Sequence, residues 1–300
     1  MTITELSIPT ILPTISIVTP SFNQGRFIEA NILSIQQQDY QTLEHIIIDG
    51  GSTDQTLQIL ETHRSRLSAV VSEKDEGQYH AINKGFAIAT GEVMAWLNCD
   101  DVYLPGALRV VGKIFGKFPQ IEWLTTRLPV AIDADGNLIK AIPVYGFTRA
   151  GFLRGDNLPG VGWPATCFIQ QESTFWRRNL WERAGGHIDT NYRMAGDFDL
   201  WARFFQYAHL YSLDVPLGCF RRHDNQRTAT SFASYIEEAK AVFARIDGHS
   251  RQGRAQSARV WLRQSLPATL RTWSIERKLM EPAPAVTYDW ATQEWVIEQR

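Results

Sequence analysis

Short apolar runs alternate with segments of helical periodicity over the first 118 residues of the chain. The apolar runs are rich in β-branched residues and predict buried strands at 15–19, 45–49, 69–72 and 92–98. The intervening apolar spacing predicts helices at 26–38, about 54–63, 78–89 and from Pro105 to about 117. This alternation predicts an α/β fold with a mostly parallel sheet and helices on both faces.

The pattern changes after residue 120. Strands are predicted at 121–126, 128–132 and 138–142, with DADGN as a hairpin turn between the last two. The segment 146–165 is rich in Gly and Pro and is predicted to be a long loop, and 197–208 has a helical apolar face. From about 231 we expect helix with a weaker apolar pattern.

These elements divide the chain into three parts. Residues 1–14 carry two prolines, Pro9 and Pro13, and are predicted to form an N-terminal arm. Residues 15–230 are predicted to form one domain with halves at about 15–118 and 119–230. The remainder, 231–300, is predicted to be a helical C-terminal extension.

Composition narrows the class of protein. Apolar residues make up 44% of the chain and charged residues 21%, as in globular proteins that fold in water. A net charge of −2 argues against a nucleic-acid partner. The three cysteines form no CxxC pair, which argues against a disulfide framework or a Cys-rich zinc site and favours a reducing compartment.

Membrane signals are weak along most of the sequence. The N-terminus lacks the basic start and apolar run of a signal peptide, and no apolar stretch reaches transmembrane length. We therefore expect a cytoplasmic protein. Residues 251–278 hold seven Arg or Lys and one Glu among apolar positions, so they suit either peripheral contact with the inner face of the membrane or a solvated helix face.

Adjacent carboxylates follow the apolar run at 92–98. In the sequence AWLNCDD, Asn98 precedes Asp100 and Asp101 at a predicted strand end. Carboxylates paired in this way hold Mg²⁺ or Mn²⁺ against substrate phosphates. The strand-end position of Asp100 favours the ligand role, whereas for Asp101 a metal ligand and a helix cap are equally expected.

Other polar residues near predicted strand or helix ends allow two interpretations each. Asp49 in DGGSTD suits a nucleotide base or ribose, or an Asx-turn for which Gly50 supplies flexibility. Asn83 suits a phosphate or sugar, or a solvated helix face. Asp197 in MAGDFDLW suits a general base or a helix cap, with Asp199 directed to another side of the helix. His223 suits a metal or diphosphate, or a structural histidine.

Two further groups have a chemical and a structural interpretation. Arg221 or Arg222 suits a leaving phosphate. Aromatic residues of the second half suit sugar stacking, although core packing is favoured for most of them: Trp163, Phe175, Trp176 and Trp181. The sequence lacks GxxxxGK[ST], GxGxxG, HExxH and GxSxG, which weakens P-loop, dinucleotide, zinc-protease and α/β-hydrolase interpretations.

The order of these motifs resembles the family 2 glycosyltransferases, which are inverting enzymes with the Rossmann-like GT-A fold. The motifs TPSFN, DGGSTD, AINKG and LNCDD carry the resemblance over about residues 14–118. It is looser through QQESTFWRRNLWERAGG and MAGDFDLW, and it fades after about 230. The segment NCD replaces the Asp-x-Asp motif of the family, with Asn98 at the first position.

The resemblance implies a role for each matching residue. The implied contacts with the nucleotide-sugar donor come from Thr19, Pro20, Asn23, Asp49, Gly50, Ser52, Asn83, Asn98 and Asp100. The implied metal ligands for Mg²⁺ or Mn²⁺ are Asp100 and Asp101, with His223 as a further contact. Asp197 matches the acceptor-side carboxylate that acts as the base.

The expected reaction follows from these roles. A sugar passes from a UDP-, GDP- or dTDP-sugar to a hydroxyl of a saccharide or lipid-linked saccharide in polysaccharide or glycoconjugate biosynthesis. An inactive nucleotide-sugar-binding relative is the main alternative. A sugar nucleotidyltransferase is a weaker one, since TPSFNQG is a poor Gly-rich phosphate loop.

Overall fold

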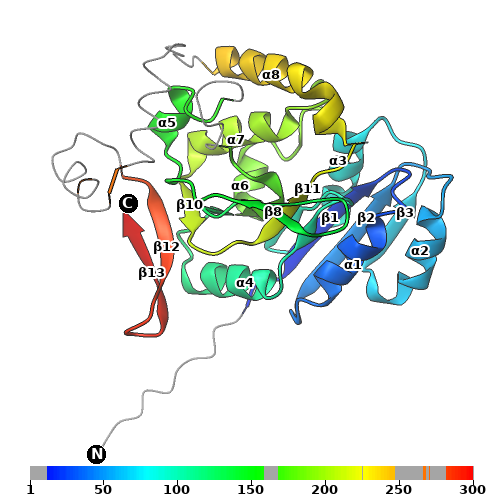
Figure 1. The fold of residues 1–300 in the computed structure, drawn as a ribbon, viewed down its shortest axis with the longest axis horizontal. Helices are drawn as coiled ribbons and strands as arrows, with labels where there is room; N and C mark the ends of the chain where they lie inside the picture. The colour runs from blue at the N-terminus through cyan, green and yellow to red at the C-terminus, as the bar shows by residue number, and fades with distance from the viewer. Residues whose placement is uncertain are drawn as a thin grey trace, which may run out of the picture.

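The computed structural model describes residues 12–158, 168–224, 226–246, 266–267, 270 and 282–299. Its main feature is a nine-stranded sheet in the order β13-β12-β10-β6-β9-β4-β1-β2-β3 (Figure 1). The strands of this sheet are β1 Ile15–Ser21, β2 Leu43–Asp49, β3 Ala69–Ser72, β4 Val93–Trp96, β6 Trp123–Thr126, β9 Phe175–Arg177, β10 Leu210–Leu213, β12 Pro284–Asp289 and β13 Glu294–Gln299.

Strand pairing in this sheet is mostly parallel. Strand β1 pairs in parallel with both β2 and β4, β2 with β3, and β10 with β6 and β12. Only β9, inserted between β4 and β6, and the terminal β13 are antiparallel to their neighbours. The predicted α/β fold with a mostly parallel sheet is confirmed.

A smaller four-stranded sheet has the order β5-β11-β7-β8. Its strands are β5 Val102–Tyr103, β11 Gly218–Arg221, β7 Val130–Ile132 and β8 Leu138–Ala141. Strand β5 begins six residues after β4 ends, and β11 leads towards His223. This small sheet therefore brings the NCDD segment and the FRRH segment together, although about 120 residues separate them.

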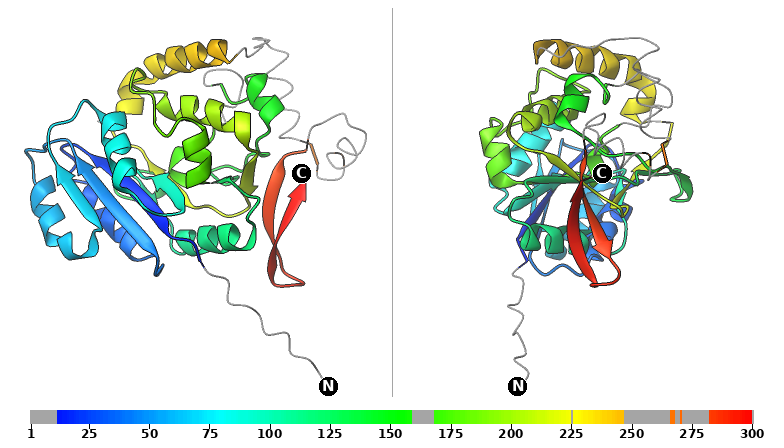
Figure 2. Two further views of the ribbon diagram at one scale, coloured as in Figure 1. Left: turned by 180° about the vertical axis from the view of Figure 1, so that it is seen from behind. Right: turned by 90° about the vertical axis from the view of Figure 1, so that its left-hand side faces the viewer.

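Helices cover both faces of the large sheet (Figure 2). They are α1 Ile28–Gln36, α2 Thr56–Thr62, α3 Gln78–Ile88, α4 Ala107–Lys117, α5 Arg149–Leu153, α6 Arg178–Arg183, α7 Gly196–Tyr207 and α8 Arg227–Arg245, with 3₁₀ turns η1 Arg64–Arg66 and η2 Gln171–Ser173. Within the described residues, no helix has both the length and the apolar character needed to cross a bilayer.

An aromatic core fills the side of the sheet beneath α6 and α7. Its members with less than 2% exposure include Trp96, Trp123, Trp176 and Trp201. Phe175 and Trp181 are also buried, so the favoured prediction of core packing is confirmed for the described aromatics of that set. Trp163 lies outside the described residues.

The end of the chain differs from its prediction. Helix α8 begins before the predicted boundary at 230, packs on α7, and extends the helical part to Arg245 (Figure 1). Residues 284–299, however, form the hairpin β12–β13, which extends the central sheet beside β10 instead of forming helix. The predicted membrane-contact segment 251–278 and most of the N-terminal arm lie outside the described residues.

The predicted loop at 146–165 also contains an element that the sequence pattern missed. Helix α5 occupies five of its residues, and the Thr148 side chain caps it by accepting a hydrogen bond from the Gly151 amide at 3.0 Å. Such a cap satisfies one of the amides that a short helix leaves unpaired.

Candidate active site

A cavity of about 770 Å³ opens at the carboxyl ends of β1 and β4. Its walls come from the end of β1, the NCD segment after β4, the start of α3, the turn η2, the start of α7 and the first turns of α8. Polar groups at the carboxyl edge of a parallel sheet are placed where ligands of such folds bind. The cavity therefore brings together the two halves that the sequence analysis separated.

Asp100 and His223 meet on one wall of this cavity. The Oδ2 atom of Asp100 lies 3.1 Å from Nε2 of His223, and their side chains are 15% and 5% exposed. The imidazole packs against the Phe27 ring at a centroid distance of 4.5 Å, which fixes its orientation. A carboxylate oxygen and an imidazole nitrogen are a donor set that Mn²⁺ accepts, and Mg²⁺ accepts the carboxylate.

The pair is too small to enclose a metal by itself. In the part of the chain that the structure describes, no group of three or more His, Cys, Asp or Glu side chains is arranged to hold a metal ion. Sites that bind a metal through one or two protein ligands obtain their other ligands from substrate phosphates and water. Asp100 and His223 fit a site of that kind.

Asp101 does not line the cavity, although the preceding Asp100 does. It is 0% exposed, and its Oδ1 accepts a hydrogen bond from the Arg221 amide at 2.8 Å while Oδ2 accepts one from Asn98 Nδ2 at 3.3 Å. Burial, reinforced by the neighbouring Asp100, raises the pKa of Asp101 well above its usual range. This geometry corrects the prediction that Asp101 is a metal ligand: its carboxyl group ties the NCDD segment to β11.

The cap alternative for Asp101 is also excluded. Helix α4 starts at Ala107 with Gly106 as its cap residue, several positions beyond the carboxylate.

The two arginines of FRRH have different positions. Arg221 is 5% exposed, donates from Nε to the Asp100 carbonyl at 2.7 Å, and lies over the Phe27 ring. Arg222 is exposed and lines the cavity. Of the two, only Arg222 is available to a phosphate.

Asp49 forms the Asx-type turn that the sequence left open as an alternative. Its carboxylate is 0% exposed, and Oδ2 accepts hydrogen bonds from the Gly51 amide, the Ser52 amide and the Ser72 hydroxyl at 3.1, 2.9 and 2.7 Å. Oδ1 accepts a further bond from the Ser52 hydroxyl at 2.5 Å. These bonds fix the DGGSTD loop and hold the carboxylate outside the cavity lining.

Other predicted donor contacts also build the loops beside the cavity. The Thr19 hydroxyl is buried against Nε2 of His45 at 3.1 Å. Asn23 accepts a hydrogen bond from the Thr53 backbone amide through Oδ1 at 2.9 Å, and the backbone amide of Asn23 donates to Ser52 Oγ at 2.7 Å. Of the predicted donor residues, Pro20, Asn98 and Asp100 line the cavity.

Gly50 has a packing role in this loop. A Cβ atom placed there would lie 2.8 Å from Oδ2 of Asp75, so only glycine lets the Asp75 carboxylate approach. Asp75 lines the cavity and accepts a hydrogen bond from the Gly77 amide at 2.8 Å, which places it at the start of α3.

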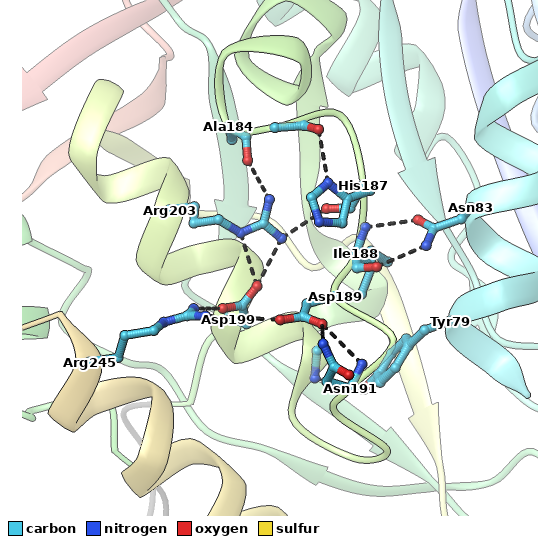
Figure 3. A network of polar contacts seen from close by, with 12 residues as sticks. Tyr79, Asn83, Ala184, His187, Ile188, Asp189, Asn191, Asp199, Arg203 and Arg245 are labelled. Atoms are coloured by element: carbon cyan, nitrogen blue, oxygen red, sulfur yellow. Dashed lines mark hydrogen bonds and ion pairs between the residues drawn. The ribbon is translucent and has the colours of Figure 1, made fainter.

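Asn83 is engaged elsewhere, contrary to the prediction that it contacts the donor (Figure 3). Its Nδ2 donates to the Ile188 carbonyl and its Oδ1 accepts from the Ile188 amide, both at 2.8 Å. Because both ends of the amide are bonded to one backbone segment, the side chain ties α3 to the chain that leads into α7.

Asp197 and Asp199 point to different sides of α7, as predicted. Asp199 is fully buried and forms ion pairs with Arg203 at 2.9 Å and with Arg245 of α8 (Figure 3). Asp197 lines the cavity instead. The first carboxylate of the pair therefore faces ligand space, and the second fastens α7 to α8.

The Asp197 carboxylate is arranged like a group that takes up a proton. It is 8% exposed, its Oδ2 accepts a hydrogen bond from the Tyr235 hydroxyl at 3.1 Å, and its buried Oδ1 has no hydrogen-bond partner among the described residues. Burial raises the pKa of Asp197 to about 6. A carboxylate with a free oxygen and a raised pKa remains ionised near neutral pH and is more basic than an ordinary aspartate.

Helix α8 supports Asp197, which lies on the neighbouring helix α7. Besides the Tyr235 hydroxyl, it provides Glu238, whose Oε2 accepts hydrogen bonds from the amides of Arg193, Met194 and Ala195 at 3.1, 2.8 and 2.9 Å. These amides lead directly into the first turn of α7, where unpaired donors need acceptors. The weak apolar pattern after residue 231 gave no signal of this contribution.

Glu172 is a further cavity residue that the sequence analysis did not identify. It sits in η2, is 4% exposed, and has its pKa raised to about 7 by burial. Its place in QQESTF, within the looser part of the family resemblance, was the one available signal.

Comparisons with known proteins agree with this architecture. The sequence profile described as Glycosyl transferase family 2 matches residues 16–130. An uncharacterized glycosyltransferase of Nostoc sp. (strain PCC 7120) is 33% identical over 232 residues, covering 76% of this chain and 70% of the relative.

Solved structures extend the similarity to the fold. S. aureus TarS 1-349 in complex with UDP-GlcNAc has a TM-score of 0.61 at 17% identity, covering 89% of this chain and 76% of that one. The mannosyltransferase PcManGT from Pyrobaculum calidifontis, in complex with GDP-Man and Mn²⁺, has a TM-score of 0.52 at 19% identity, covering 91% and 82%. The sheet, the cavity at its carboxyl edge and these matches lead to one conclusion: the chain belongs to the family 2 glycosyltransferases and has the GT-A fold.

Proposed function

We propose that this glycosyltransferase moves a sugar, with inversion, from a nucleoside-diphosphate donor to a hydroxyl of a saccharide or lipid-linked saccharide acceptor. The observation that carries the proposal is the buried Asp197 carboxylate in the cavity that Asp100 and His223 also line, because one of its oxygens accepts no hydrogen bond from the described residues. Nucleotide-sugar donors of the solved neighbours, UDP-GlcNAc and GDP-Man, support the donor class. We place the reaction in polysaccharide or glycoconjugate biosynthesis in the cytoplasm.

Asp197 acts as the base in this proposal. Its Oδ1 takes the proton of the acceptor hydroxyl as the hydroxyl oxygen forms a bond to the anomeric carbon of the donor. The bond between that carbon and the diphosphate oxygen breaks on the opposite side, and its electron pair leaves with the diphosphate. A positioned base typically supplies ~10²–10⁴-fold in rate.

Asp100 and His223 would hold a divalent cation beside the leaving diphosphate. Mg²⁺ or Mn²⁺ bound there supplies positive charge that stabilises the leaving group. Arg222 and Arg227 line the same cavity and add fixed positive charge. The Mn²⁺-bound neighbour supports this assignment.

Calorimetric titration tests the proposal. The protein is titrated with UDP-, GDP- and dTDP-sugars with and without Mn²⁺, beside the Asp100→Ala and Asp197→Asn variants. We expect metal-dependent binding of a donor, its loss in Asp100→Ala, and its retention in Asp197→Asn. Donor hydrolysis or transfer by Asp197→Asn should fall by ~10²–10⁴-fold.

Two results would contradict the proposal in different ways. If folded protein binds no donor under any condition, the nucleotide-sugar function is wrong, whereas donor binding without turnover on any acceptor favours the inactive relative. If Asp197→Asn retains a near-wild-type rate, the base assignment alone is wrong. The configuration of the anomeric carbon in the product, read by NMR, decides between inversion and retention.

A further inference from the structure

We propose that the rings of Phe168, Phe232 and Tyr235 form the acceptor subsite, and that a pyranose ring stacks there by its apolar face beside Asp197. The inference rests on the proposed function, because it assigns the acceptor of that reaction. These three residues differ from the aromatics that the sequence analysis considered, which are buried in the core where they are described.

The three rings form a continuous aromatic surface. Phe232 and Tyr235 lie one helical turn apart on α8, with ring centroids separated by 6.4 Å and ring planes inclined by 10°. Phe168 approaches Tyr235 from the segment before η2, with a centroid distance of 6.0 Å and a plane angle of 41°. All three residues line the cavity, so the surface faces the space that contains Asp197.

The exposure of these rings indicates a missing partner. Phe168 is 41% exposed and Phe232 is 44% exposed, whereas Tyr235 beneath them is 6% exposed. Large aromatic side chains that remain exposed inside a concave, mostly preformed pocket are typical of ligand contacts. The Oδ1 atom of Asp197 in the same cavity is an independent sign, because it is a buried acceptor to which no described residue donates a hydrogen bond.

A pyranose ring fits both observations at once. Its C–H face is apolar and flat enough to cover an aromatic ring, and its edge carries hydroxyls that donate hydrogen bonds. The Tyr235 hydroxyl contacts Oδ2 of Asp197 at 3.1 Å, so a sugar resting on these rings would lie beside the Asp197 carboxylate. Arg193 and Thr228, which also line the cavity, provide polar groups for the other hydroxyls.

An acyl chain is a poorer occupant of the same surface. It would cover the rings but would offer no proton to Asp197 and no partner to the polar groups around them. A buried polar atom left without a partner is less favourable than one that is hydrogen-bonded. The chemistry of the wall therefore favours a saccharide acceptor over direct recognition of a lipid chain.

Saturation-transfer NMR provides the test. The probes are the methyl pyranosides of glucose, galactose, mannose and N-acetylglucosamine, with octyl glucoside below its micelle concentration as the chain probe. Each is added to protein with UDP or GDP and Mn²⁺. The variants are Phe232→Ala, Phe168→Ala and the conservative Phe232→Tyr, with Trp290→Ala as control because Trp290 is 84% exposed and outside the cavity lining.

We expect at least one methyl pyranoside to bind, with saturation strongest on the protons of one ring face. Loss of an aromatic contact of moderate strength should weaken its binding about tenfold in Phe232→Ala or Phe168→Ala. Phe232→Tyr and Trp290→Ala should change it by less than about twofold. Circular dichroism and melting temperature establish that each variant is folded.

Three results would overturn the subsite. The first is that no methyl pyranoside binds to wild-type protein. The second is that both alanine variants bind the pyranosides as wild type does. The third is that saturation of octyl glucoside is confined to its alkyl chain. Donor affinity is measured on the same samples. If wild-type protein binds a nucleotide sugar, such results refute the acceptor subsite alone, whereas absence of donor binding refutes the proposed function itself.

Discussion

Replacing Tyr235 with Phe removes one hydrogen bond from Asp197 and should move the acidic limb of the pH–rate profile upward. The hydroxyl donates to Oδ2 of the carboxylate at 3.1 Å and lowers the pKa of Asp197, in opposition to the larger effect of burial. A hydrogen-bond donor stabilises the ionised form of a carboxyl group, so removal of the Tyr235 hydroxyl raises the pKa of Asp197. The substitution keeps the aromatic ring and therefore the surface shared with Phe232.

The size of the shift follows from the energy of such a bond. A hydrogen bond to a charged group contributes about 1.5–3 kcal/mol, and one pKa unit corresponds to about 1.36 kcal/mol. The pKa of Asp197, about 6 in the wild type, should therefore rise by at least about one unit. At pH 6 about half of the wild-type carboxylates but about a tenth of the variant's are ionised, so the rate falls about fivefold. At pH 8 the two proteins should differ little.

The assay is kcat/KM for hydrolysis or transfer of whichever nucleotide sugar binds, measured from pH 5 to 9. Tyr40→Phe is the matched control, because Tyr40 is also buried and its hydroxyl donates one hydrogen bond, to the Pro13 carbonyl, away from the cavity lining. The control should keep the wild-type limb. A Tyr235→Phe profile whose acidic limb stays in place or moves to lower pH would refute Asp197 as the titrating base.

Two further substitutions test the electrostatics of the site by unfolding experiments. Burial raises the pKa of Glu172 from an ordinary 4.5 to about 7, so its contribution to stability is present below about pH 4.5 and is lost as pH rises towards 7. Glu172→Gln should therefore raise the melting temperature at pH 8, with a gain of at most about 3 kcal/mol in the free energy of unfolding, and should have no effect at pH 4. An equal gain at both pH values would be inconsistent with a titrating Glu172. Arg203→Met leaves the buried Asp199 with one of its two arginines and should reduce the free energy of unfolding by about 3–5 kcal/mol in urea titrations. Lys84→Met, whose partner Glu73 is exposed, should have little effect, and similar losses in both variants would show that burial of Asp199 does not determine the cost.

The sequence predicted the first half of the domain, residues 15–118, because its signals there are local. Strands such as ISIVT and HIIID are bounded by turns, and each is buried on both faces, so composition alone identifies them. The β12–β13 hairpin was missed for the opposite reason. Strand β12 pairs with β10, about 70 residues earlier in the chain, and such long-range pairing leaves little trace in local periodicity.

Site residues were harder to predict than the fold because ligand contacts and loop construction use the same side chains. Asp49 ends strand β2 and Asn83 lies within helix α3, and for both short polar residues either role is chemically reasonable. Asn83 is hydrogen-bonded to backbone groups and Asp49 to backbone amides and serine hydroxyls, whereas Asp100 and Asp197 line the cavity. Only the three-dimensional structure, which shows the hydrogen-bond partners of each side chain, distinguishes residues that build loops from residues that face the cavity.

The distribution of carboxyl groups explains why donor binding and positive charge must be linked in this cavity. Burial raises the pKa of Asp101 and Glu172, so the protein can hold protons on acids that would otherwise repel one another. A donor diphosphate would bring further negative charge beside Asp100 and near an Asp197 that must stay ionised to act as base. Arg222, Arg227 and a cation at Asp100 and His223 are the available compensation. The proposed base depends on the same balance of charge. In a site with too little positive charge, the bound diphosphate would raise the pKa of Asp197. More of the carboxyl groups would then be protonated and unable to accept the proton of the acceptor hydroxyl.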